Sequence, residues 1–242
     1  MSSVIQVSQV YYPESDGKPM GETDYHRKEI IRQIELLEDY YRGQKVYVSG
    51  DLLVYYVQGD PRKFVVPDAF VVKGIVPRDR RIYKIWVEGK APDMVIETTS
   101  RRTRRKDRHI KPELYAQLGV KEYFLFDPLG EYLDPPLQGY RLDGNRYQPI
   151  EPDEDGGLES RELQLRLRLA EGHLDFVRMD TGERLLTRDE RLREETEARK
   201  REAEARKREA ERAEREAAAR QAAEAEVTRL LAELARRPPA PE

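Results

Sequence analysis

The chain has 242 residues, enough for one ordinary domain with an additional segment or for two small domains. Charged residues make up 38% of the sequence and hydrophobic residues another 38%, so part of the chain must lie outside a compact core. The net charge of -3 excludes attraction of a polyanion by the molecule as a whole, and the absence of cysteine excludes disulfides, thiolate catalysis and cysteine-ligated zinc.

Composition divides the chain into four predicted parts. They are a flexible N-terminal extension over residues 1–21, a globular domain over 22–187, a long charged helix over 188–237 and a disordered tail over 238–242. The start lacks the basic and apolar regions of a signal peptide, and nowhere do 18 apolar residues run together. We therefore expect a cytoplasmic protein with no membrane partner.

The first predicted elements are a helix and a pair of strands. Over residues 26–41, apolar side chains recur at three- and four-residue spacing, as in an amphipathic helix, and Thr23 or Asp24 could cap its start. Residues 45–60 are rich in Val, Tyr and Leu and are interrupted by Ser-Gly-Asp. This pattern predicts a hairpin of two strands.

Buried strands and a second helix follow. Apolar residues after Pro67 predict that Asp68 opens a strand, and the apolar run at residues 94–96 predicts another. A helix is expected between His109 and Leu118, and the sequence VKEYFLFDP after it reads as a further buried strand.

Short strands are expected between residues 140 and 176, with the clearest hairpin in GYRLDGNRYQPI. Helices and strands in this order predict an α/β (α+β) fold with a central mixed sheet flanked by helices, followed by a long C-terminal charged helix.

The charged segment carries a seven-residue repeat, EARKREA, without large apolar residues at the positions that form a coiled-coil seam. Glu precedes Arg at four-residue spacing, and each such pair stabilises a helix by about 0.2–0.5 kcal/mol. An apolar stripe occurs only at Val227, Leu230, Leu231 and Leu234. It could pair with a second copy of the chain or with a partner helix.

Two Pro-Asp dipeptides, at Asp68 and Asp93, and the nearby Glu97 suggest an acidic metal site. Magnesium-dependent hydrolysis of a phosphodiester needs one or two carboxylates and a nearby cation. Asp93 and Glu97 would lie about 13 Å apart on one extended strand, whereas Asp68 on a neighbouring strand could approach Glu97. We therefore predict Asp68 and Glu97 as the metal ligands and keep Asp93 as a supporting residue.

A basic run after Ser100 is the candidate for holding a phosphate backbone. An exposed loop that is basic by chance explains it equally well, and Glu97 could pair with one of its arginines. The candidate nucleic-acid contacts are Arg101, Arg102, Arg104, Arg105 and Lys106.

Glu97-Thr98-Thr99 after Asp68 resembles the PD-(D/E)xK nuclease pattern, with Thr99 in place of its lysine. The wider segment is similar to the Uma-two family of putative restriction endonucleases. The matching residues are Pro92, Asp93, Val95, Glu97, Ser100, Lys111, Tyr115, Gly119, Val120, Glu122, Tyr123 and Asp127, with His26 and Pro67-Asp68 as earlier landmarks.

This resemblance implies a restriction-endonuclease-like core in which Lys111 replaces the absent lysine, although Pro112 directly after it departs from the family pattern. Lys106 and Arg105 compete with Lys111 for that role. His26 and Glu29, at the start of the first helix, are further candidates beside the metal, and packing or capping is the other interpretation of His26.

The leading hypothesis is a magnesium-dependent endonuclease acting on nucleic acid, most naturally DNA, with manganese as an alternative metal. Asp68, Glu97 and Lys111 would be its catalytic residues. Two other hypotheses remain open. The domain could be a catalytically silent module that binds another protein through the long helix, or that helix could serve as a spacer or dimerisation arm.

Overall fold

The computed structural model describes residues 10–17 and 23–235. The predicted extension over 1–21 falls mostly outside these ranges, and the predicted tail over 238–242 falls entirely outside them. Contacts divide the chain into two units, which meet in the sequence between Thr187 and Arg188.

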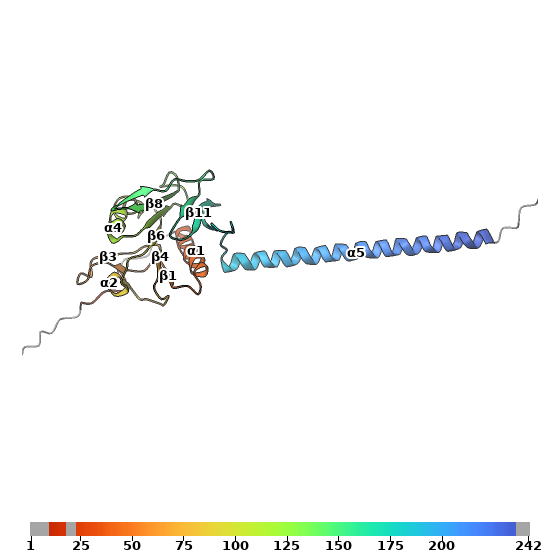
Figure 1. Cartoon of the computed structure of the whole chain (residues 1–242), viewed down its shortest axis with the longest axis horizontal. Helices are drawn as coiled ribbons and strands as arrows, with labels where there is room; N and C mark the ends of the chain where they lie inside the picture. The colour runs from red at the N-terminus through yellow and green to blue at the C-terminus, as the bar shows by residue number, and fades with distance from the viewer. Residues whose placement is uncertain (1–9, 18–22, 236–242) are drawn as a thin grey trace, which may run out of the picture. The chain divides into compact units, whose positions relative to one another are not determined.

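A six-stranded mixed sheet forms the centre of the first unit (Figure 1). In sheet order its strands are β1 (Val46–Ser49), β4 (Ala69–Lys73), β6 (Met94–Thr98), β7 (Glu122–Phe126), β8 (Leu137–Asp143) and β9 (Arg146–Pro149). Only the β6–β7 pair of this sheet is parallel, because helices connect these two strands, and parallel neighbours require such a crossover. The predicted α/β class with a central mixed sheet is confirmed.

Both faces of the central strands are buried, which explains why β6 and β7 read as continuous apolar runs. Helix α1 (Asp24–Tyr40) packs on one face through Leu36 and Leu37, together with a second sheet of β10 (Leu158–Ser160), β11 (Leu165–Ala170) and β12 (His173–Arg178). Thr23 caps α1 by accepting from the His26 N–H at 3.3 Å.

The opposite face is covered by α4 (Lys111–Leu118) and by a small sheet of β3 (Phe64–Val65), β2 (Val54–Tyr55) and β5 (Tyr83–Lys84), after which comes the short α2 (Ile85–Glu88). The predicted hairpin over residues 45–60 is wrong. Strand β1 pairs with β4, whereas β2 pairs with β3 and β5 in the small sheet.

The basic run after Ser100, for which an exposed loop was one interpretation, instead leads into a helix, α3 (Arg104–His109), and Ile110 separates this helix from α4. Ser100 and Thr103 start it: the Ser100 N–H donates to Thr103 Oγ1, and the Arg104 N–H donates to the Ser100 carbonyl. Pro112 lies in the first turn of α4, where its missing N–H is tolerated.

Two predicted features of the second half are confirmed. GYRLDGNRYQPI forms the β8–β9 hairpin, whose two-residue turn holds Gly144 at φ +58°. Strand β7 occupies the predicted buried run and is buried at every position.

The second unit contains α5 (Arg188–Ala235), a helix of 48 residues. At 1.5 Å per residue its length is about 72 Å. Its charged side chains pair along its own surface, for example Arg206 with Glu202 at 2.7 Å and Arg212 with Glu216 at 2.9 Å. Among the helices in the described ranges, none is both long and apolar enough to cross a membrane.

Candidate active site

Asp68 and Glu97 come from adjacent antiparallel strands. The register pairs Ala69 with Ile96, so Asp68, one residue before β4, lies across from Glu97 on β6. Phe70, two residues after Asp68, and Val95, two residues before Glu97, belong to one apolar cluster, and side chains two apart on a strand share a face. The two carboxylates therefore project to the same side of the sheet. Asp68 Oδ2 is fixed there by accepting the Thr98 backbone N–H at 2.7 Å.

Lys111 and Tyr115 reach Glu97 from α4. The Lys111 ammonium donates to Glu97 Oε2 at 2.5 Å, and the Tyr115 hydroxyl donates to Glu97 Oε1 at 2.7 Å. Residues four apart on a helix lie on the same face, which is why both side chains meet one carboxylate. Sequence analysis named Tyr115 only as a residue that matches the family pattern and missed this contact, although its four-residue spacing from Lys111 was a usable signal.

Asp107 is a third buried carboxylate at this place, and no sequence argument singled it out. Its Oδ1 lies 2.9 Å from the Lys111 nitrogen. Burial raises the pKa of Glu97 well above its usual range; the Lys111 charge opposes this rise, while Asp68 and Asp107 add to it. Burial alone would lower the pKa of Lys111, but the three carboxylates outweigh burial and raise it.

His26 joins α1 to the end of β6. Its Nε2–H donates to the Thr98 carbonyl at 2.5 Å and lies 3.8 Å from Asp68 Oδ2. Gln33, two turns further along α1, donates to Thr98 Oγ1 at 3.2 Å. The structure thus places the buried His26 side chain beside Asp68 and the end of β6.

A cleft of about 590 Å³ opens over these groups, and Asp68, Lys111, His26 and Arg102 line it together with isoleucines of α1. Glu97 is fully buried and contacts Lys111 at the boundary of this cleft. A ligand in the cleft would therefore meet Asp68 and Lys111 directly.

The donor set suits a hard divalent cation. The carboxylates of Asp68, Glu97 and Asp107 all lie close enough to Lys111 to act on its charge, and carboxylate oxygens are the ligands that such a cation prefers. Each carboxylate oxygen has two lone pairs and can accept a further ligand beside its hydrogen bond. Within the described ranges, no group of three or more histidine and acidic side chains is placed to hold a metal ion. Magnesium needs fewer protein ligands, because water and phosphate oxygens complete its shell.

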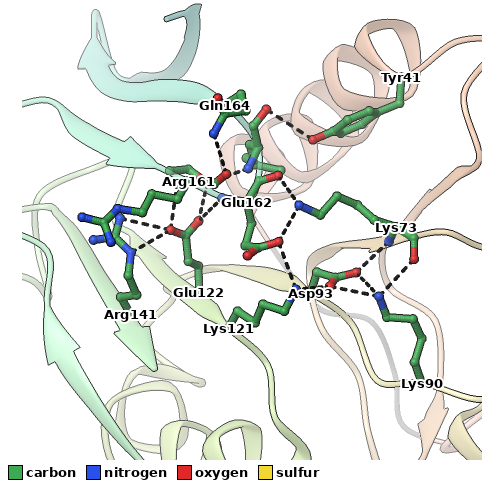
Figure 2. A network of polar contacts seen from close by, with 12 residues as sticks. Tyr41, Lys73, Lys90, Asp93, Lys121, Glu122, Arg141, Arg161, Glu162 and Gln164 are labelled. Carbon is green, nitrogen blue, oxygen red and sulfur yellow. Dashed lines mark hydrogen bonds and ion pairs between the residues drawn. The ribbon is translucent and has the colours of Figure 1, made fainter. Parts of the chain in front are cut away.

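Asp93 lies at the other end of β6 from Glu97, in a separate polar network (Figure 2). Its carboxylate accepts from the Lys90 ammonium at 2.7 Å and from the Lys73 backbone N–H at 2.7 Å, and Lys121 lies 3.0 Å away. These contacts stabilise the ends of neighbouring strands and involve none of the cleft residues.

Glu29, on α1, contacts the second sheet. It accepts from the Leu174 N–H at 3.2 Å and contacts His173 Nδ1, so it ties α1 to β12.

The predicted nucleic-acid contacts are exposed. Arg101 and Arg102 lie in the turn before α3, and Arg104, Arg105 and Lys106 form its first turn. Of the five, Arg102 lines the cleft with Lys111. The cation that contacts Glu97 is Lys111 rather than an arginine of this run.

Two further acidic residues of the family-like segment have structural contacts. Asp127 accepts four backbone N–H groups of the following loop, from Leu129, Gly130, Tyr132 and Leu133. Glu122 joins the central sheet to the second one by accepting from Arg141 at 3.1 Å, from the Arg161 and Glu162 N–H groups, and from the Ser160 hydroxyl (Figure 2).

A mixed sheet with two carboxylates and a lysine at a cleft is an arrangement suited to metal-assisted hydrolysis of phosphodiesters. Comparison with family models matches residues 15–172 to Uma2, described as "Putative restriction endonuclease". The match covers more than half of the chain, and the chain belongs to this family. This membership confirms the resemblance read from the sequence and places the protein among nucleases.

One of the solved structures similar to this chain is a protein from Anabaena variabilis ATCC 29413, described as a putative nuclease belonging to DUF820. The two are 18% identical, the alignment covers 60% of this chain and 76% of that one, and the TM-score is 0.44. Among proteins of curated function, none matches the chain.

Proposed function

We propose that the chain is a magnesium-dependent endonuclease that hydrolyses phosphodiester bonds of DNA. The observation that carries this proposal is the convergence of Asp68 and Glu97 from adjacent strands, with the Lys111 ammonium 2.5 Å from the Glu97 carboxylate at the boundary of the cleft. Family membership supports the nuclease class, and the two carboxylates that project to the same side of the sheet support a divalent metal.

Asp68 and Glu97 would hold the magnesium ion, and manganese has the same preference for oxygen ligands. When bound, the metal would supply Lewis acidity toward a phosphate oxygen and a more acidic water. Lys111 directs a positive charge into the cleft, where it would stabilise the negative charge that develops on the phosphate during attack. Arg102 and the cations of α3 would hold the phosphate backbone without reading its sequence.

The test is a cleavage assay on supercoiled and linear DNA with Mg²⁺ or Mn²⁺. We expect wild-type protein to cleave, and Asp68→Asn and Glu97→Gln to lose activity by at least about 100-fold, a typical cost of removing an essential electrostatic group. Glu151→Gln, at an exposed position outside the cleft, is the matched control and should cleave like wild type. Absence of cleavage by wild type, or equal cleavage by the Asp68 variant, would contradict the proposal.

We also propose an interaction role for α5, through a second copy or a partner helix. Val227, Leu230 and Leu231 are exposed and recur at helical spacing. The remaining predicted member of this stripe, Leu234, has a side chain outside the described part of the structure. Sedimentation of the intact chain distinguishes self-association through this stripe from binding to a different partner.

A further inference from the structure

Asp107 is the exception within α3. Its neighbours Arg104, Arg105, Lys106 and Arg108 are exposed cations, whereas the Asp107 side chain is fully buried. Among the described residues, neither of its carboxylate oxygens accepts a hydrogen bond of regular geometry. A buried carboxylate is costly in free energy unless a cation compensates it, so its presence requires an explanation.

The explanation lies one turn further along the chain. The Lys111 ammonium is 2.9 Å from Asp107 Oδ1, which makes it the compensating charge although the contact lacks hydrogen-bond geometry. Lys111 thereby bridges two carboxylates, Asp107 on α3 and Glu97 on β6. Asp107, Lys111 and Tyr115 follow one another at four-residue spacing, so one column of side chains faces Glu97 across the junction of two helices.

The backbone at this junction is also fixed. The Tyr123 hydroxyl, from β7, donates to the Asp107 carbonyl at 2.7 Å. In an uninterrupted helix this carbonyl would accept the N–H of residue 111. Tyr123 thus satisfies the Asp107 carbonyl where α3 ends, while Asp107 keeps its carboxylate directed at Lys111.

We propose that Asp107 is a positioning residue for Lys111. The lysine side chain has four flexible carbons, and Glu97, its other anchor, would also be a metal ligand under the function proposed above. An anchor that does not bind the metal keeps the ammonium at the cleft while Glu97 coordinates. This inference rests on the proposed endonuclease function, in which Lys111 acts on the phosphate.

The first test is a double-mutant cycle with Asp107→Asn and Lys111→Met, measured as kcat and KM for DNA with Mg²⁺. We expect Asp107→Asn to lower kcat by at least about tenfold, with KM and the Mn²⁺ affinity within about twofold of wild type. In the Lys111→Met background the same change should cost nothing further, because Asp107 acts only through the lysine. Independent losses that multiply, or an undiminished kcat for Asp107→Asn, would overturn the proposal.

The second test does not need activity. Amine acetylation read by mass spectrometry should modify Lys111 several-fold faster in Asp107→Asn than in wild type, while exposed Lys63 reacts equally in both. Asp107→Ser provides the same comparison if the Asn variant does not fold. An unchanged Lys111 rate in folded protein would overturn the positioning role. Absence of DNA cleavage by wild type with a changed Lys111 rate would reject the nuclease proposal and leave the anchoring contact supported.

Discussion

Buried carboxylates in this domain fall into two groups according to their partners. Asp93 and Glu122 accept from several donors each, including cations and backbone N–H groups. Asp107 and Glu97 share the single ammonium of Lys111 and lie against the cleft that Asp68 lines. The first group is held by several donors of the fold, whereas the second depends on one lysine that also lines the cleft.

Asp93 makes acid stability testable. Burial raises the pKa of its carboxyl, but bonds from Lys90, the Lys73 N–H and Lys121 outweigh burial and lower it. A depressed pKa contributes stability above the unfolded-state pKa, and this stability is lost as pH falls through the folded-state pKa. We expect the urea midpoint of wild type to fall more steeply between about pH 5 and about pH 3 than that of Asp93→Asn. Parallel pH profiles would contradict this assignment.

How far the site could be predicted depended on whether its contacts were local. Asp68 and Glu97 were predicted from Pro67, strand geometry and the family resemblance, with the assumption that their two strands are neighbours, and the register of β4 with β6 agrees with that assumption. Asp107 did not follow, because a lone aspartate in a basic run resembles an exposed counter-charge. Only the packing of α3 against the sheet shows that this position faces inward.

At the scale of elements, Glu122 connects two sheets that are distant in the sequence. Its substitution by Gln keeps the shape but leaves Arg141 and two backbone N–H groups with a weaker acceptor. We expect Glu122→Gln to lower the free energy of unfolding by about 1–3 kcal/mol in urea titrations. Glu159→Gln, on the exposed side of β10, should change it by less than about 0.5 kcal/mol. Equal effects would mean that the cross-sheet contacts contribute little.

The exposed cations of α3 should bind DNA through its phosphates. Changing Arg104, Arg105 and Lys106 together to Ala should weaken binding of any DNA sequence. The slope of log affinity against log salt should fall by about 0.9 for each phosphate that the variant no longer neutralises. Fluorescence anisotropy at several salt concentrations measures both. Arg146→Ala, at an exposed position on β9, is the control. An unchanged slope in the triple variant would exclude α3 from the DNA interface.

Elements were predictable where their signals were local. The amphipathic first helix, the buried β7 and the β8–β9 hairpin each depend on short-range periodicity or a two-residue turn. The pairing of β1 with β4 rather than β2 depends on residues more than 20 positions apart, which no turn signal reports. Helix α3 was missed because its start depends on side-chain bonds between Ser100 and Thr103.

For the whole molecule, the composition of α5 determines whether the chain associates with a second copy. Its surface ion pairs stabilise the helix without a partner, since exposed Glu–Arg pairs at four-residue spacing each add a few tenths of a kcal/mol. The stripe at Val227, Leu230 and Leu231 covers little more than one helical turn, far less than the three to four heptads of a sustained coiled coil.

We therefore expect the intact chain to sediment as a monomer at micromolar concentration, which would leave the stripe for a different partner. A dimer that dissociates on dilution, and that Leu230→Glu abolishes, would instead assign the stripe to a second copy. Glu209→Gln, at an exposed position in the charged part of α5, is the control, because it changes the charge of the helix outside the stripe.

The central claim is that Asp68 and Glu97 hold one divalent metal ion, and titration calorimetry with Mn²⁺ tests it most directly. We expect one Mn²⁺ site per chain in wild type, unchanged in Glu151→Gln, and weakened by at least about tenfold in both Asp68→Asn and Glu97→Gln. Binding of the same strength in the Asp68 and Glu97 variants, or no binding to folded wild type with or without DNA, would contradict it.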